Sequence, residues 1–372
     1  MNEIKKYKFC DLYDMASGIS STKGQAGHGA PFLSFGTVFN NYFLPENLTD
    51  KMDTTIEEQN TFSIKKGDVF VTRTSETIDE LAMSSVALKD YPNATYSGFV
   101  KRLRPKTTGI VYDKFLAFYL RSKLFRKTMT NNATMTLRAS FNEDIFSFLY
   151  LYLPSYEEQK KIGDLLYNIE MKMLANKKIN DNLEQQAYLI FENMMAKAEA
   201  HRLKGKYIEA KFLTSVITGK EDANFSVPNG KYKFFTCSNK PLYCNSYAFD
   251  TSSILIAGNG DFNVKHYSGK FNAYQRTYVL TPKKEYFALL YLASLYRINS
   301  FKSSSSGSIV KFITKSDVEN IPVFIPDDTA YLDELNKLLL AQEQNSLENE
   351  LLVQLRDWLL PMLMNGQATI SD

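Results

Sequence analysis

Hydrophobic residues follow a helical repeat along two long stretches of the chain. In the first stretch the positions alternate by four and three, which is the spacing of a helix that packs along one face, and the second stretch shows a similar stripe with a polar middle. The first stripe consists of Ile162, Leu166, Ile169, Met173, Asn176, Asn180, Leu183, Ala187, Ile190 and Met194. The second consists of Leu335, Leu339, Gln342, Leu352, Leu355, Leu359 and Leu363.

Both stripes become polar near their centres, at Asn176 and Asn180 in the first and at Gln342–Asn345 in the second. We therefore expect two long helices that pair antiparallel with their polar centres in contact. Buried polar positions would then set the register of the pair at some cost in stability. The alternative is two helices packed within one large core, but their length and charged outer faces argue against it.

Short apolar runs bounded by turn residues predict strands before each long helix. Lys66-Gly67-Asp68 leads into the run Val69-Phe70-Val71, and Ser252-Ser253 leads into Ile254–Ala257. Further elements are expected as strands at Ala30–Phe39, Lys231–Cys237, Gly98–Arg104 and Arg276–Leu280, as a strand or short helix at 7–16 and 207–218, and as helices at Lys114–Arg126 and Tyr286–Ile298. The predicted fold class is α+β.

These segments occur twice. Phe115, Tyr119, Leu120, Ser122, Leu153-Pro154 and Leu183 recur 172 residues later as Phe287, Tyr291, Leu292, Ser294, Ile325-Pro326 and Leu355. Nearer the start of each half, Leu12, Gly18 and Leu33-Ser34-Phe35 recur 201 residues later as Leu213, Gly219 and Phe234-Phe235-Thr236. The first module therefore holds 29 extra residues in its strand-rich part. Two similar modules joined by long helices suit the recognition of two half-sites.

Composition limits the class of protein. A chain of 372 residues with 44% hydrophobic and 13% aromatic residues is expected to form at least two packed domains. The three cysteines have neither disulfide nor metal-ligand spacing, no hydrophobic run reaches the length of a membrane span, and the N-terminus lacks an apolar signal core. We expect a cytoplasmic protein without a membrane partner.

Charge is uneven along the chain. Ser97–Phe141 holds ten Lys or Arg and one acidic residue, and Asn263–Lys315 holds nine and one. Residues 327–372 hold two basic and nine acidic residues. Basic stretches at equivalent places in both modules favour binding to a polyanion such as double-stranded DNA. The alternative is a lysine-rich face exposed to solvent.

Several motifs together resemble the specificity subunit of a type I restriction–modification system, over nearly the whole chain. They are Lys66–Thr77, Gly230–Ser238, Ala257–Gly260, Asn272–Val279, Leu153-Pro154 with Glu158–Ile162, and the tail Leu355–Gly366. Residues after Pro326 depart from the pattern, since Asp327-Asp328-Thr329 stands where Glu-Gln-Lys-Lys-Ile would recur. Only the local partner contact is put in doubt by that departure.

The resemblance implies tandem target-recognition domains at 1–154 and 204–326, followed by long spacer helices at 155–203 and 327–372. It also implies a bipartite DNA site, two methyltransferase (modification) subunits and restriction (translocase) subunits as partners. A helix of about 35 residues is about 50 Å long. We expect such a rod to separate two half-sites by about one turn of B-DNA or slightly more.

Candidate DNA contacts lie in loops at strand ends, where Arg and Lys can bind guanine and Asn and Gln can bind adenine. The full set of candidates is Arg73, Thr74, Ser75, Thr77, Lys101, Arg102, Arg138, Asn259, Lys265, Lys270, Gln275, Arg276, Ser305, Ser306 and Lys311. Lys101, Arg102 and Arg104 are expected to meet phosphates or solvent, and the serine run before Lys311 either links flexibly or binds phosphates. Asn259 between two glycines is either a base contact or a plain hairpin turn.

No methyltransferase motif of the Asn/Asp-Pro-Pro-Tyr/Phe type and no phosphate-binding Gly-x4-Gly-Lys-Ser/Thr loop occurs. Glu209 and Lys211 have the spacing of a nuclease pair, but no convincing partner Asp precedes them, so a solvated strand face is the preferred interpretation. His28, His201 and His266 are scattered. We expect a non-catalytic subunit with no cofactor and no metal, the alternatives being a stand-alone nuclease or a coiled-coil scaffold.

Overall fold

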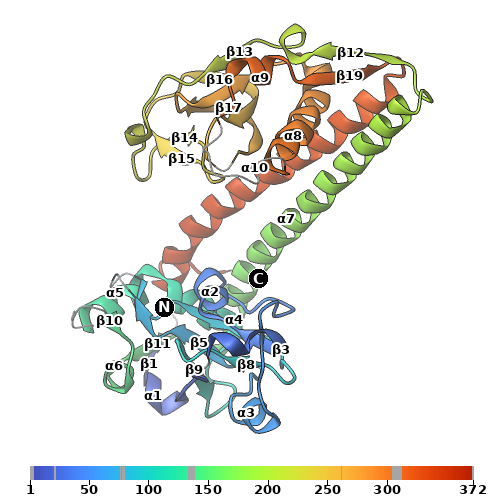
Figure 1. The fold of residues 1–372 in the computed structure, drawn as a ribbon. Coiled ribbons are helices and arrows are strands. Elements are labelled where there is room, and N and C mark those ends of the chain that lie inside the picture. Colours follow the sequence, from blue (N-terminus) through green and yellow to red (C-terminus); the bar gives the residue numbers. More distant parts are fainter. Residues whose placement is uncertain are drawn as a thin grey trace. The chain divides into compact units, whose positions relative to one another are not determined.

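The computed structural model describes residues 4–370 apart from 21, 76, 78, 79, 133–138, 261 and 304–311. The chain divides into two compact units (Figure 1). Unit 1 comprises Met1–Met173 and Leu351–Asp372, and unit 2 comprises Leu174–Glu350. Two long helices, α7 (Tyr156–Glu199) and α10 (Ala330–Met364), contribute to both units. Both had been predicted from their hydrophobic stripes.

Unit 1 is built on an antiparallel sheet in the order β2-β9-β5-β7. These strands are β2 (Tyr13–Ser17), β9 (Val100–Pro105), β5 (Val69–Thr72) and β7 (Ser84–Val86). Smaller sheets pair β1 (Lys5–Lys8) with β11 (Tyr150–Leu153), β6 (Thr74–Ser75) with β10 (Ala139–Ser140), and β3 (Ala26–Leu33) with β4 (Lys51–Met52) and β8 (Thr95–Tyr96).

The shorter helices of unit 1 differ from expectation at two places. They are α1 (Phe9–Leu12), α2 (Phe35–Asn40), α3 (Ile56–Thr61), α4 (Asp113–Arg121), α5 (Lys123–Asn132), α6 (Glu143–Phe148) and the 3-10 turn η1 (Lys23–Gln25). The strand predicted at Ala30–Phe39 ends at Leu33, because the Ser34 hydroxyl caps a helix by accepting a hydrogen bond from the Thr37 amide. The single helix predicted at Lys114–Arg126 is two, because the backbone of Ser122 is extended.

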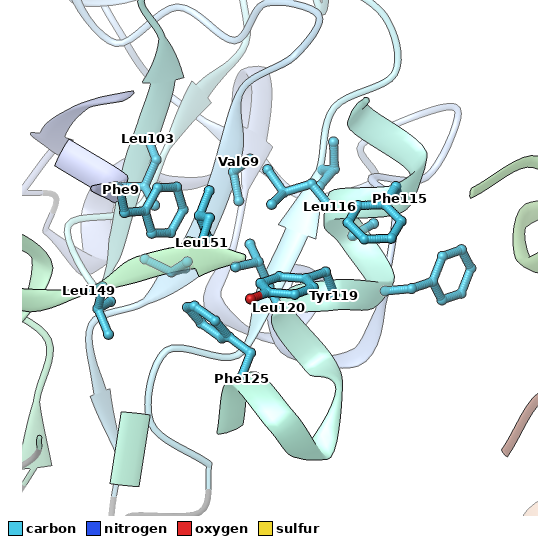
Figure 2. Packing of buried hydrophobic residues seen from close by; sticks show 14 of the residues in the cluster. Phe9, Val69, Leu103, Phe115, Leu116, Tyr119, Leu120, Phe125, Leu149 and Leu151 are labelled. Atoms are coloured by element: carbon cyan, nitrogen blue, oxygen red, sulfur yellow. The ribbon is translucent and has the colours of Figure 1, made fainter. Parts of the chain in front are cut away.

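One hydrophobic core joins the sheet and helices of unit 1. Aromatic and aliphatic side chains from α1, β5, β9, α4 and β11 interlock there (Figure 2). Ile162 and Leu166 of α7 and Leu363 and Met364 of α10 complete it. Each fully buried large side chain stabilises the fold by about 1.5–3 kcal/mol, so the chain's two distant ends are held in one unit by packing.

Unit 2 contains a six-stranded sheet in the order β13-β18-β16-β17-β14-β15, antiparallel except for the pair β14–β17. The strands are β13 (Val216–Thr218), β18 (Thr277–Leu280), β16 (Phe249–Ala257), β17 (Val264–Ala273), β14 (Tyr232–Phe235) and β15 (Leu242–Cys244). β12 (Gly205–Glu209) pairs with β19 (Pro322–Pro326). The helices are α8 (Phe287–Ser303) and α9 (Lys315–Glu319), with 3-10 turns η3 (Ala210–Phe212), η4 (Ala223–Phe225) and η5 (Lys284–Tyr286).

The predicted repeat is visible in the contacts of both units. Gly18 and Gly219 sit equally close to the backbone, since an added Cβ would lie 2.2 Å from the Ser97 carbonyl oxygen and 2.0 Å from that of Ala273. The recurring residues of α4 and α8 are buried in the cores of their own units. Leu153 lies in the β1–β11 pair and Ile325 in the β12–β19 pair. Each unit is therefore one copy of the same arrangement.

Within unit 2, α7 and α10 run antiparallel and their polar centres meet, as predicted. Asn176, 1% exposed, donates hydrogen bonds to Glu348 (2.7 Å) and Asn349 (2.9 Å). Asn180 donates to Ser346 (3.1 Å) and accepts from Asn345 (2.9 Å). These amides can pair only in one register, which is how buried polar positions specify helix pairing.

In unit 1 one position of the second stripe is wrong. Leu355 is 42% exposed, and the neighbouring Arg356 takes the inner face. Its guanidinium donates to Glu170 of α7 (3.2 Å) and lies over the Tyr42 ring. The Arg356 charge is paired and most of its aliphatic stem is buried. Arg356 therefore faces the inside of unit 1, where the spacing alone predicts that Leu355 would lie.

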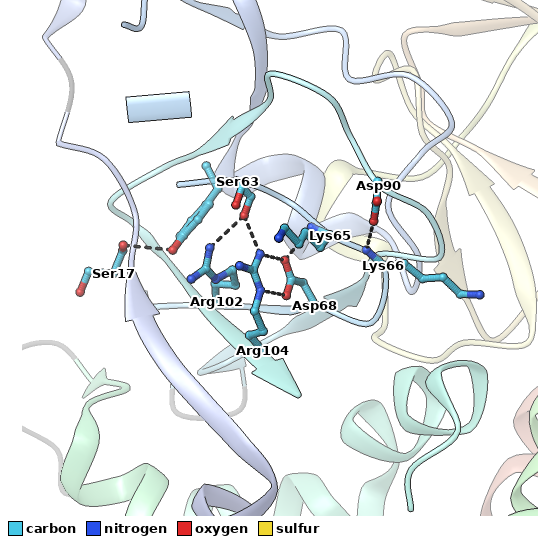
Figure 3. A network of polar contacts seen from close by, with 9 residues as sticks. Ser17, Ser63, Lys65, Lys66, Asp68, Asp90, Arg102 and Arg104 are labelled. Atoms are coloured by element: carbon cyan, nitrogen blue, oxygen red, sulfur yellow. Dashed lines mark hydrogen bonds and ion pairs between the residues drawn. The ribbon is translucent and has the colours of Figure 1, made fainter. Parts of the chain in front are cut away.

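A buried carboxylate organises the turn before β5 (Figure 3). Asp68 is 0% exposed and accepts hydrogen bonds from Nε (2.7 Å) and Nη2 (2.6 Å) of Arg104 and from the Lys65 amide (2.7 Å). Arg104 and Arg102 both donate to the Ser63 carbonyl at 2.9 Å. Expecting Arg104 to meet phosphate or solvent was therefore wrong, because its charge is needed inside the unit.

We predict that Asp68→Ala lowers the free energy of unfolding by about 3 kcal/mol, because it leaves the Arg104 guanidinium without its partner. Urea unfolding followed by circular dichroism measures the change. Asp50→Ala, at an exposed position, is the matched control and should change stability by less than about 0.5 kcal/mol. Equal midpoints for the two variants would contradict this role of Asp68.

Candidate nucleic-acid interface

In unit 1 the predicted residues gather where β5 and β9 leave the core. The Arg73 amide donates to the Phe99 carbonyl (2.8 Å), and the Arg73 carbonyl accepts from the Phe141 amide (2.7 Å). The Arg73 side chain is exposed, and Thr74 and Ser75 follow it in β6. Thr77 is also exposed.

Lys101 lies on the neighbouring strand, two residues after Phe99, and donates to the Ser17 hydroxyl (2.7 Å). Burial lowers the pKa of the Lys101 ammonium, and the nearby positive charge of Arg73 lowers it further. The Glu143 carboxylate acts in the opposite direction and raises the pKa of Lys101. Lys101 and Arg73 thus place two positive charges at this strand end.

In unit 2 an equivalent set of backbone bonds joins the ends of β16 and β18. The Gly258 amide donates to the Arg276 carbonyl (2.9 Å), and the Gly258 carbonyl accepts from the Ile313 amide (3.0 Å). A Cβ at Gly258 would lie 2.7 Å from the Arg276 carbonyl oxygen, so only glycine fits. Asn259 is half-buried and follows Gly258 in the turn, with Gly260 at a φ of +71°.

Polar side chains surround this turn. Arg276 and Gln275 are exposed, and Gln275 donates to the Asp222 carboxylate (3.0 Å). The Arg276 guanidinium carbon lies 5.8 Å from the centre of the Phe312 ring. Lys270 lies away from this turn, since it pairs with Asp250 near the start of β16; it is exposed, with its ammonium 4.8 Å from the Tyr247 ring centre. Arg, Gln and Asn side chains thus stand at one strand end with hydrogen-bonding groups available to a partner.

Two predicted contact residues are engaged inside their units. Arg102 donates to the Ser63 carbonyl and stacks on Tyr96. Lys265 donates to the carbonyls of Thr236 and Ser238, and burial lowers the pKa of its ammonium. Both side chains bind loop carbonyls of their own unit, and we do not retain them as proposed DNA contacts.

The basic stretch of unit 1 places less positive charge on the surface than its sequence predicts. Arg121 is largely buried and donates to the carbonyls of Val38, Phe39 and Asn41 at the end of α2. Burial lowers its pKa to about 10. Together with Arg102 and Arg104 it shows that a basic sequence can supply internal carbonyl partners instead of a surface charge.

Four candidates, Arg138, Ser305, Ser306 and Lys311, lie outside the described residues. Sequence reasoning missed Phe99 and Phe312, which are 66% and 60% exposed beside Arg73 and Arg276. An exposed phenylalanine in a strand-rich segment resembles a core residue in sequence, so no signal distinguished them. The acceptor Asp222 could not be found from the sequence because its partner, Gln275, is 53 residues away along the chain.

Unit 2 also fixes its sheet against α10 through a polar junction. Glu343 accepts a hydrogen bond from Ser268 (2.9 Å), and Nδ1 of His266 lies 3.4 Å from the same carboxylate oxygen. Lys233 of β14 pairs with Glu350. Burial alone would raise the pKa of Glu343, but its contacts with His266 and Ser268 hold that pKa below its usual value.

The described residues offer little for catalysis. No three His, Cys, Asp or Glu side chains among them are grouped to hold a metal ion. Glu209 and Lys211 form an ion pair with each other, and Lys211 is exposed while Glu209 is half-buried. No helix in the described part of the chain is long and apolar enough to cross a membrane.

Comparison with known proteins identifies the family. Residues 5–185 and 193–349 match the family model described as the type I restriction modification DNA specificity domain. The chain belongs to this family. Over 171 residues it is 39% identical to the type I restriction enzyme EcoDI specificity subunit of Escherichia coli, an alignment that covers 44% of this chain and 38% of that protein.

The fold of this specificity-domain chain is similar to the crystal structure of the S subunit of the type I restriction–modification system from M. genitalium. The TM-score is 0.62 at 16% identity, and the match covers 97% of this chain and 96% of that one. At this identity the likeness establishes the fold, namely two α+β modules with long helices. The fold class expected from the sequence is confirmed.

We predict that Glu343→Gln lowers the free energy of unfolding at pH 7 by about 1 kcal/mol, since the carboxylate is half-buried and partly screened. A depressed carboxyl pKa stabilises the fold above the ordinary pKa of about 4.3 and ceases to do so as pH falls through the folded-state value. Urea unfolding from pH 7 to pH 3 should therefore show the two proteins converging in acid.

Glu334→Gln, on an exposed position of the same helix, is the control and should give no such convergence. A difference between wild type and Glu343→Gln that is independent of pH would show that the carboxylate charge is not what joins the sheet to α10.

Proposed function

We propose that this chain is the DNA-sequence-specificity subunit of a type I restriction–modification complex, and that each module reads one half of a bipartite site. The observation that carries the proposal is the repeated strand end, where the same backbone bonds present Arg73 in unit 1 and Arg276 in unit 2. Family membership supports the class of activity.

The proposed contacts divide by chemistry. Arg73, Asn259, Gln275 and Arg276 carry planar groups that can form two hydrogen bonds with a base edge, and they are the proposed base readers. Thr74, Ser75, Thr77, Lys101 and Lys270 are proposed to contact phosphates and position the module. Arg138, Ser305, Ser306 and Lys311 remain predicted contacts, and the boundaries 1–154, 155–203, 204–326 and 327–372 remain the proposed domain limits.

The chain itself is proposed to be non-catalytic. The described residues hold no metal-ligand cluster, and the one nuclease-like pair is closed on itself. Cleavage and methylation would then come from other subunits, with this chain as their scaffold. Neither the nuclease nor the coiled-coil-scaffold alternative is favoured by a particular contact.

Apolar residues exposed on the long helices support the scaffold role. On α10, Leu340 and Leu347 in unit 2 and Leu351 and Trp358 in unit 1 are between 46% and 59% exposed. Apolar side chains in excess on a charged helix are typical of a surface that a partner covers. We propose that two methyltransferase subunits dock here, one on each unit, and that restriction subunits join the assembled complex.

We predict that Arg73→Ala relaxes one half-site and Asn259→Ala the other, each by roughly tenfold in affinity. Selection from a random duplex pool, followed by titration of the selected sites at fixed salt, measures both. The unchanged half-site in each variant is the internal control. Equal loss on every sequence would assign the residue to phosphate contact instead of base recognition.

We predict that native mass spectrometry of the chain co-expressed with its methyltransferase finds two methyltransferase subunits per chain. Leu347→Asp and Trp358→Asp should each leave one, because a charge in an apolar contact is costly to desolvate. Gln354→Asp, exposed on the same helix, should still bind two. A single methyltransferase on the wild-type chain would refute the proposed stoichiometry.

A further inference from the structure

Each module places one arginine and one phenylalanine at its strand end. In unit 1 the Arg73 amide donates to the Phe99 carbonyl (2.8 Å), one step beyond the ladder pair Thr72–Val100, so the two residues are neighbours across the strand end. Phe99 is the third residue of the turn Ser97–Val100, which the Val100 amide closes by donating to the Ser97 carbonyl (2.9 Å). Phe99 is 66% exposed and Arg73 is exposed as well, so both side chains are open to a partner.

In unit 2 the corresponding opposite positions are Gly258 and Arg276, one step beyond Ala257–Thr277. Arg276 thus occupies the backbone place of Phe99, and Gly258 the place of Arg73. Because Gly258 has no side chain, the aromatic residue comes from a third segment. The Ile313 amide bonds to the Gly258 carbonyl, and this seats the preceding residue, Phe312, beside Arg276.

The two modules therefore reach the same pairing by different routes. The backbone is equivalent, but the arginine and the phenylalanine come from different segments in each. An exposed phenylalanine alone is ordinary on a protein surface. Its recurrence beside an arginine at the same strand end, through a different residue position, indicates that the pairing and not the position is what the site requires.

The chemistry of the pair selects a ligand. A guanidinium forms two hydrogen bonds with O6 and N7 of guanine in the major groove, and an apolar side chain beside it contacts the methyl group of thymine. We propose that Phe99 and Phe312 are specificity-determining residues, each of which contacts the 5-methyl group of a thymine adjacent to the guanine bound by its neighbouring arginine. This rests on the proposed function and names two bases that each module reads.

The test uses the full-length chain with any subunits that co-purify with it. Bipartite sites are first selected with the wild-type chain, and each thymine is then replaced in turn by deoxyuridine, which removes only the methyl group. One thymine in each half-site, next to a guanine, should cost about fourfold in affinity, the value of one buried methyl group. With Phe99→Ala the cost should vanish in one half-site and persist in the other, and Phe312→Ala should do the reverse.

Two matched controls are present in the chain. Phe148 in unit 1 and Phe212 in unit 2 are 68% and 72% exposed, and Phe148→Ala and Phe212→Ala should leave both deoxyuridine costs in place. Phe99→Leu retains apolar surface and should keep part of the thymine preference. Circular dichroism of each variant confirms that it is folded.

The outcomes are separable. If the wild-type chain selects no two-part site, the proposed function fails. If it selects one, but deoxyuridine costs nothing or costs the same in Phe99→Ala as in wild type, the DNA-reading function stands and the assignment of the phenylalanines is refuted. An equal loss of affinity for all sequences in Phe99→Ala would also refute the assignment, because the ring would then contribute to DNA binding without sequence preference.

Discussion

The constraint on which both modules depend is a central strand buried on both faces. In β5, Val69 and Val71 enter one core while Phe70 enters another. In β16, Ile254 and Ile256 face one core and Leu255 a second. A segment buried on both faces, such as all of β5 and Ser253–Ala257 of β16, offers no side chain to a partner. Its first free side chains come where it leaves the core, and this is where Arg73 and Asn259 stand. The location of the candidate site therefore follows from the packing.

Much of this could be predicted from the sequence, because the signals are local. The apolar runs of β5 and β16, the helical stripes and their polar centres all show in residue spacing, and so does the repeat. Predictions failed where a distant partner decides the outcome. Arg104 is basic in sequence, but in the fold its guanidinium pairs with the buried Asp68 carboxylate. Arg356 lies on an inner face because the Glu170 carboxylate is opposite it. Exposure of Phe99 likewise depends on contacts that no spacing records.

The repeat is also more uneven than sequence matching alone suggests. Equivalent hydrogen bonds relate Arg73 to Gly258 and Phe99 to Arg276, so the offset falls in steps between its values near Gly18 and near Phe115. Insertions are thus spread between elements instead of forming one block. The family motif after Pro154 shows a similar substitution. Gln159, 1% exposed, anchors the backbone at Ile110 and Tyr112, and in unit 2 Asn336 anchors Glu285 and Ala288. In unit 2, where the Glu-Gln-Lys-Lys-Ile motif is missing after Pro326, the side-chain amide of Asn336 therefore takes the role that Gln159 has in unit 1.

This separation of framework from contact residues has a consequence for how specificity can change. The framework consists of buried strands, the tight glycine contacts and the internally used arginines, and substitutions there are costly. Arg73, Asn259, Gln275 and Arg276 lie at loop positions that are exposed or half-buried, where substitutions generally cost less than about 0.5 kcal/mol unless a specific contact is lost. On the proposed function, new side chains at these positions would alter which bases are bound while the stability of the module stays nearly constant. The two units illustrate this tolerance. The same backbone arrangement holds Arg73 just after β5 in unit 1 and Arg276 in the turn before β18 in unit 2.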